Sequence, residues 1–285
     1  MAGTTISAAA LRRELSVRAE AFAQKHSLRY HLSYGEPPVV AFEPADTSHG
    51  NFLPEAYEAI QRNPSWQRRL TKVHTAARSS LPKLWDRNWC ELDTCTSSDA
   101  LLMNVFCHPE TLADGRVARM LGVEGEARPE FGVRARCPIV NDRVDRTEVD
   151  LILGDLLIEA KLTEGDFQTA PRELVEQYRD FARVFARREL PKNNRRYAGY
   201  QLIRNVLAAF AMGGSFCVLA DARRPDLREQ WFSVMRCVRD AELRTRCKML
   251  TWQELAEVLP ERLRVFLAEK YGIGDEAAVQ VEADV

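Results

Sequence analysis

Residues Thr147 to Thr163 read TEVDLILGDLLIEAKLT, and this stretch decides the fold. Two apolar runs with strand-like alternation flank Gly154-Asp155, and Gly-Asp between two such runs signals a two-residue hairpin turn. With these two residues at the tip, residues at equal distances from it face each other across two antiparallel strands. The stretch therefore predicts a hairpin around which the rest of the chain is organised.

The two faces of this predicted hairpin differ in polarity, because successive side chains of a strand point to opposite faces. One face is entirely apolar and consists of Val149, Leu151, Leu153, Leu156, Ile158, Ala160 and Leu162. The other face consists of Glu148, Asp150, Ile152, Leu157, Glu159 and Lys161. We expect the first face to be core and the second to gather three carboxylates and one amine at the end away from the turn.

Asp150 lies opposite Glu159 in this register, and directly opposed like charges destabilise a sheet by roughly 0.2–1 kcal/mol per pair. A hard divalent cation would offset this repulsion, and Mg²⁺ commonly uses one or two protein carboxylates together with substrate phosphate. Lys161 lies on the same face, within reach of a water bound to such a cation. The alternative is a solvated hairpin face on which Lys161 neutralises its neighbours.

Composition limits the class of protein. The chain has 285 residues, 46% of them hydrophobic, which suits one large domain or a domain with an extension. The net charge of −1 means that nucleic-acid binding must come from local basic patches. The seven cysteines form no C-x-x-C pair and predict no zinc ribbon or disulfide framework. The N-terminus lacks a signal peptide's apolar core and the longest apolar run is too short to span a membrane, so we expect a cytoplasmic protein that does not contact membranes.

The order of predicted elements indicates a mixed α/β sheet flanked by helices. A helix from Asp166 or Thr169 to about Arg188, a helix over residues 197–212 and strands over residues 134–140, 215–221 and 246–251 surround the hairpin. We expect a mostly helical N-terminal extension over residues 1–92, an α/β domain over 93–272 and a disordered acidic tail over 273–285.

Asp150 followed after eight residues by Glu159-Ala160-Lys161 resembles the PD-(D/E)XK nuclease superfamily, which carries an acid and E-x-K on its central hairpin. SSDALLMNVF at Ser97 to Phe106, IEAKLTEGDF at Ile158 to Phe167 and YQLIRN at Tyr200 to Asn205 also resemble a bacterial family of PGN-type restriction endonucleases. The proline that usually precedes the first acid is absent, since Val149 stands there. The resemblance implies a restriction-endonuclease-like fold.

The resemblance also implies a Mg²⁺-dependent nuclease, with Mn²⁺ as a substitute metal. Asp150, Glu159 and the backbone carbonyl of Ala160 would hold the metal, and Glu148 would bind a second metal or tether Lys161. Lys161 would orient or deprotonate the attacking water, or pair with the phosphate.

Four further residues are candidates for substrate binding. The resemblance favours Gln201 facing the site, and a polar helix surface is the alternative. Arg195 and Arg196 belong to a dense basic loop suited to a nucleic-acid backbone. Asn104 is the one polar residue inside an apolar helical stretch, so it either makes a core hydrogen bond or points into the site.

Two other classes of function stay open. The chain could be a non-catalytic nucleic-acid-binding protein that has kept the fold, although an intact Asp, Glu and Lys set argues against this. It could also be an interaction protein whose N-terminal helices bind a partner. The favoured hypothesis is a DNA endonuclease of restriction type, which would pair as a two-fold homodimer to cut both strands.

Overall fold

The structure is a computed structural model that describes residues 6–73, 81–83, 88–113 and 115–274. The chain divides into two compact units. The first unit comprises residues 1–122, 221–223 and 251–285, and the second comprises residues 123–220 and 224–250. This division differs from the boundary expected near Asp93, because residues 98–122 and 251–272 belong to the first unit. The acidic tail after Gly274 lies outside the described residues.

The second unit contains a five-stranded sheet with the strand order β12-β11-β7-β6-β3. The strands are β3 (Pro129–Arg134), β6 (Glu148–Leu153), β7 (Leu156–Ala160), β11 (Ser215–Ala220) and β12 (Cys247–Thr251). β7 pairs antiparallel with β6 and parallel with β11, so the sheet is mixed as expected. The hairpin register is also confirmed, since Leu153 faces Leu156 and Leu151 faces Ile158.

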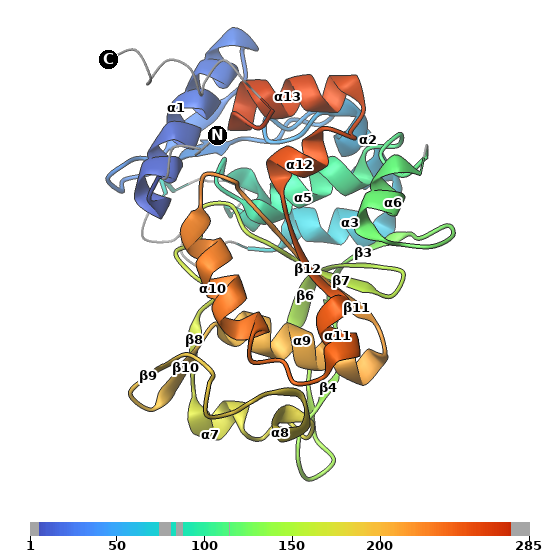
Figure 1. Cartoon of the computed structure of the whole chain (residues 1–285). Coiled ribbons are helices and arrows are strands. Elements are labelled where there is room, and N and C mark those ends of the chain that lie inside the picture. The colour runs from blue at the N-terminus through green and yellow to red at the C-terminus, as the bar shows by residue number, and fades with distance from the viewer. Residues whose placement is uncertain (1–5, 74–80, 84–87, 114, 275–285) are drawn as a thin grey trace, which may run out of the picture. The chain divides into compact units, whose positions relative to one another are not determined.

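Both faces of the hairpin are buried. The apolar face is core as predicted, with Leu151, Leu153 and Ile158 fully buried. The face that carries Glu159 is buried as well, because helix α9 (Tyr200–Met212) lies against β7 and β11 (Figure 1). Ile152 and Leu157 join the α9 core on this side. Val149 joins it too, although strand alternation had placed Val149 on the other face. The solvated hairpin face is therefore excluded at Glu159.

The prediction of one long helix between Asp166 and Arg188 is wrong. The segment forms β8 (Thr169–Pro171) and the short helices α7 (Arg172–Val175) and α8 (Phe181–Val184). Backbone bonds to a distant segment replace the local helical ones, since Val140 N–H donates to the carbonyl of Gln177 and Arg179 N–H to that of Pro138. Tyr178, Phe181 and Phe185 still reach the core, but Leu174 is exposed.

Short strands and helices complete the second unit. Two of the strands, β4 (Cys137–Pro138) and β5 (Val144–Asp145), pair with each other, so the strand expected over 134–140 is split between β3 and β4. The others are β9 (Lys192–Asn193), β10 (Arg196–Ala198), α10 (Pro225–Met235) and α11 (Ala241–Thr245). β8, β10 and β9 form a separate three-stranded sheet in that order.

The first unit is mostly helical. Its elements are α1 (Ala8–Lys25), β1 (Tyr30–Leu32), β2 (Val40–Phe42), α2 (Pro54–Arg62), α3 (Pro64–Gln67), η1 (Arg68–Thr71), η2 (Glu91–Asp93), α5 (Ser98–Cys107), α6 (Arg116–Leu121), α12 (Trp252–Ala256) and α13 (Glu261–Tyr271). Helix α13 packs on α1, although they lie at opposite ends of the chain. Its buried Lys270 donates to the carbonyl of Gly50 at 2.9 Å and to Asn51 Oδ1 at 2.6 Å. No helix in the described part of the chain is long and apolar enough to cross a membrane.

A substitution at Gly214 tests how closely the hairpin tip packs against the start of β11. An added Cβ at Gly214 would lie 2.2 Å from the carbonyl oxygen of Asp155, which also accepts the Ser215 N–H at 3.0 Å. Gly214→Ala must therefore push the tip away from β11, and we expect it to lower the free energy of unfolding by about 1–3 kcal/mol in urea titrations. Gly165→Ala is the matched control, because an added Cβ there meets nothing within 4 Å and the backbone is not left-handed. Equal stability of the two variants would contradict this account.

Candidate active site

Glu159 is the centre of a buried polar cluster in the second unit. It lies on β7 with only 1% of its surface exposed. Its Oε1 accepts hydrogen bonds from Lys161 Nζ at 2.8 Å and from Gln201 Nε2 at 2.7 Å, and its Oε2 accepts one from Asn205 Nδ2 at 2.7 Å. A buried carboxylate requires such donors, because an unpaired buried charge is strongly unfavourable. The predicted neighbourhood of Glu159, Lys161 and Gln201 is therefore present.

Asp150 approaches the same end of the hairpin from β6. Its Oδ2 accepts the backbone N–H of Ala160 at 2.8 Å, where the ladder of paired residues between the two strands has ended. The side chain is half-buried, so it lies at the edge of the cluster and not beneath it. Asp150 therefore lies beside Ala160, at the same end of the hairpin as Glu159.

Lys161 is buried among carboxylates. Burial by itself lowers the pKa of this ammonium, but three neighbouring carboxylates outweigh burial and raise the pKa above its usual range. The three belong to Glu159, Glu164 and Asp150. These carboxylates favour the protonated form of Lys161, which donates to Glu159 Oε1.

Helix α9 supplies the other side of the cluster. Gln201 and Asn205 are one helical turn apart, so both amide groups reach the same carboxylate. Arg204 donates from Nε and Nη2 to Asn205 Oδ1 at 3.2 and 3.1 Å and from Nη2 to the carbonyl of Glu148 at 3.3 Å. Its Nη2 also lies 3.9 Å from Glu159 Oε2. These bonds tie α9 to both strands of the hairpin.

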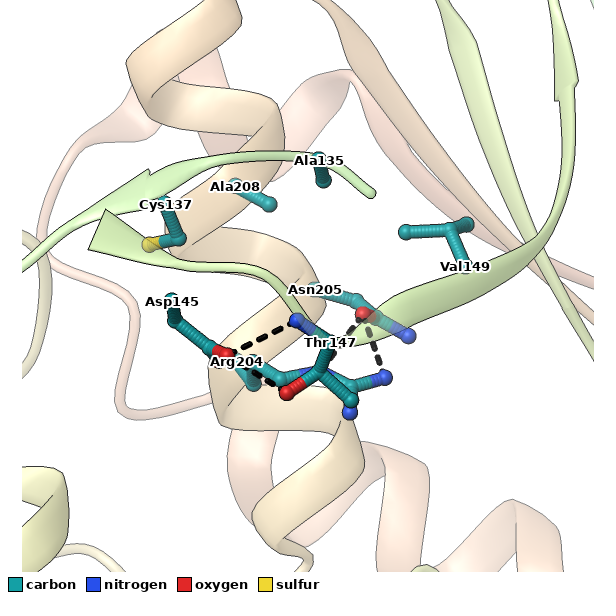
Figure 2. A pocket seen from close by; sticks show the side chains of 8 residues that line it. All are labelled: Ala135, Cys137, Asp145, Thr147, Val149, Arg204, Asn205 and Ala208. Carbon is teal, nitrogen blue, oxygen red and sulfur yellow. Dashed lines mark hydrogen bonds between the residues drawn. The ribbon is translucent and has the colours of Figure 1, made fainter. Parts of the chain in front are cut away.

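A small hollow lies beside Arg204 and Asn205 (Figure 2). It is lined by Ala135, Cys137, Asp145, Thr147, Val149, Arg204, Asn205 and Ala208. Asp145 accepts hydrogen bonds from the backbone and hydroxyl of Thr147 and from the hydroxyl of Tyr178. Although burial opposes it, these bonds lower the pKa of Asp145. Asp145 is therefore a charged acid that lines this hollow.

The remaining predicted residues lie elsewhere. Arg195 and Arg196 are exposed on the three-stranded sheet, and within the described residues neither forms a hydrogen bond or ion pair with the cluster. Asn104 lies in the first unit with no exposed surface. It accepts the Leu53 N–H at 2.7 Å and donates to the carbonyls of Asn51 and Ala100. Of its two predicted roles, the structure shows the core hydrogen bonds.

The donor set can be compared with what Mg²⁺ requires. In the described part of the chain, no group of three or more His, Cys, Asp or Glu side chains is arranged to hold a metal ion, so Glu148 does not join Asp150 and Glu159 in such a group. Mg²⁺ nevertheless often takes one or two carboxylates and completes its shell with water and phosphate. The carboxylates of Asp150 and Glu159 with the Ala160 carbonyl would be an all-oxygen set of this kind.

The side-chain oxygen of Gln201 gives a second indication. This oxygen is buried and has no hydrogen-bond partner in the described structure, while the amide nitrogen is held by Glu159. A buried carbonyl oxygen without a partner costs about 1–3 kcal/mol, which a bound cation or its water would recover. The residues present therefore fit a hard divalent cation.

Sequence reasoning missed Glu164. Its Oε2 accepts the backbone N–H of Leu162 at 2.6 Å, and its charge acts on Lys161. Glu164 follows the end of β7, where strand alternation no longer assigns a side chain to a face. Its place in a Glu-Gly turn just after the E-x-K strand was the available signal.

The second unit is a mixed sheet flanked by helices with an acid and E-x-K at the end of its central hairpin, which is compatible with a restriction-endonuclease-like fold. A family model described as Restriction Endonuclease associating with ARP matches residues 8–272, and the chain belongs to this family. The restriction-endonuclease part of the expected resemblance is thereby confirmed, under a family description other than the PGN type. Searches of curated proteins and of solved structures give no match.

Lys161→Met tests the charge balance of the cluster. The substitution keeps a long side chain but removes the cation, which leaves Glu159 as a buried charge without its ammonium. We expect a loss of about 3–5 kcal/mol in the free energy of unfolding, measured in urea without metal ions. The double variant Glu159→Gln/Lys161→Met removes the uncompensated charge and should recover part of the loss. A single variant within about 0.5 kcal/mol of the wild type would show that the pair does not support the fold.

Proposed function

We propose that the chain is a metal-dependent nuclease of the PD-(D/E)XK superfamily, which hydrolyses phosphodiester bonds of DNA as a restriction-type endonuclease. Membership of a restriction endonuclease family supports the nuclease class. The observation that carries the proposal is the meeting of Asp150, Glu159 and Lys161 at one end of the hairpin, beside the unpartnered side-chain oxygen of Gln201.

Asp150, Glu159 and the Ala160 carbonyl would hold Mg²⁺, with Mn²⁺ as a substitute. A bound Mg²⁺ polarises the phosphate and lowers the pKa of a coordinated water. Asp150 is half-buried and reaches the site from its edge, where a scissile phosphate would enter. Glu159 is held in one orientation by three donors, so its oxygens are preorganised for ligation.

Lys161 acts as an electrostatic group in this proposal. Its ammonium is held 2.8 Å from Glu159 Oε1 and donates to the phosphoryl oxygens, on which negative charge increases during the reaction. Gln201 directs its free oxygen toward the attacking water and fixes Glu159 through its amide nitrogen.

Asp150→Asn tests the proposal with little change in shape. We expect the rate of cleavage of duplex DNA in Mg²⁺ to fall by at least about a hundredfold, because a charged ligand becomes neutral. Asp155→Asn is the matched control, since it makes the same change at the exposed tip of the same hairpin. It should leave cleavage unchanged.

Calorimetry of Mg²⁺ binding separates the proposal from its alternative. The wild type and Asp155→Asn should bind Mg²⁺, while Asp150→Asn should bind it more weakly. Cleavage that survives in Asp150→Asn would refute the assignment of the site. A wild type that binds DNA without cleaving it or binding Mg²⁺ would be a non-catalytic protein that has kept the fold.

A further inference from the structure

The strands β9 and β10 form a hairpin arm, which we define as residues 192–198. Asn193 pairs with Arg196 and Lys192 with Tyr197, so Asn194 and Arg195 form the turn. Asn194 has a φ of +53°, which asparagine tolerates better than most residues. In Figure 1 the arm extends beside β8 at the edge of the second unit. All five residues from Lys192 to Arg196 are exposed.

The base of the arm is firmly anchored. Tyr197 is fully buried, donates to Glu176 Oε1 at 2.9 Å and contacts the ring of Phe181 edge-on. β10 also pairs with β8 over Ala198 and Thr169. Arg196 donates to the hydroxyl and the carbonyl of Thr169. The arm therefore holds a defined position relative to β8, while its residues 192–196 are exposed to solvent.

The arm and the loop before it are strongly basic. Residues 187–196 read RRELPKNNRR, which contains five cations and one carboxylate in a chain with a net charge of −1. Arg187 is paired with Glu176 at 2.7 Å. Lys192 donates to the carbonyl of Arg188 and lies over the ring of Tyr197, so neither contact neutralises its charge. Within the described residues, no carboxylate lies within ion-pair distance of Lys192, Arg195 or Arg196.

The arm lies close to the candidate active site along the chain. Arg196 is five positions before Gln201, which donates to Glu159, so their Cα atoms are at most about 18 Å apart. Gln201 N–H also donates to the carbonyl of Phe167, and the Phe167 ring lies 5.7 Å from Lys161 Nζ. Duplex DNA rises 3.4 Å per base pair, so Arg196 at the base of the arm lies within the length of about five base pairs from Gln201.

We propose that the hairpin arm binds the phosphate backbone of double-stranded DNA, on the same duplex as the bond that the site cleaves. This inference rests on the proposed nuclease function. Unpaired cations on an anchored strand pair suit a fixed row of phosphates, and contacts of this kind position the duplex without reading its sequence. Single strands are less suitable, because their binding usually depends on exposed aromatic side chains and the arm's one aromatic residue, Tyr197, is buried.

The double variant Lys192→Gln/Arg195→Gln tests the arm. Arg196 is left intact, because its bonds to Thr169 support the arm itself. The control Arg228→Gln/Arg244→Gln removes two exposed arginines of the same unit that lie outside the arm. Binding of a labelled duplex is measured by fluorescence anisotropy in EDTA over a range of salt concentrations, so that no cleavage occurs.

We expect the arm variant to bind the duplex roughly tenfold or more weakly at 0.1 M salt. The slope of log K against log salt should become shallower by about two, one for each lost phosphate contact. The control should keep the wild-type slope. An unchanged slope in the arm variant, equal losses in both variants, or a loss seen with single strands alone would each overturn the inference.

Cleavage assays keep this inference separate from the proposed function. If the arm variant shows the expected slope while no cleavage depends on Asp150, the nuclease assignment fails and the arm remains a DNA-binding element. If Asp150-dependent cleavage is present and the slope does not change, the arm fails and the nuclease assignment remains.

Discussion

The carboxylate of Glu159 joins the hairpin to helix α9, and the geometry of the second unit depends on this interaction. A buried charge is tolerated only when it is paired and fully hydrogen-bonded. Lys161 supplies the opposite charge from the same strand, while Gln201 and Asn205 supply amide groups from successive turns of α9. These bonds fix the rotation of α9 about its axis. The same bonds that satisfy the core therefore also set the orientation of the candidate metal ligands.

The parts of the fold that could be predicted are those that depend on residues close together in the sequence. The hairpin follows from alternation on either side of Gly154-Asp155, and β11 follows from a continuous apolar run. The region between Asp166 and Arg188 could not be predicted in this way. Its apolar spacing suits a helix, but backbone bonds between the segments around Pro138 and Tyr178 compete successfully with helical ones. Such long-range pairing leaves no local pattern.

The site was predictable to a similar extent. Strand alternation brought Asp150, Glu159 and Lys161 to one end of the hairpin, and helical spacing placed Gln201 and Asn205 one turn apart. The burial of Glu159 was not predictable, because it depends on where α9 packs. Glu164 was missed because it follows the strand, and Asn104 remained ambiguous because one polar residue on an apolar helix suits a core bond as well as a site.

The packing of α13 on α1 has a consequence for biosynthesis. The first unit needs residues from both ends of the chain, since buried Lys270 on α13 holds the loop at Gly50 and Asn51. A ribosome delivers residues 123–250 before it delivers α13. The first unit therefore stays incompletely folded during synthesis, while the second unit is already able to fold. Translation thus favours an order in which residues 123–250 fold first and the N- and C-terminal segments pack together afterwards.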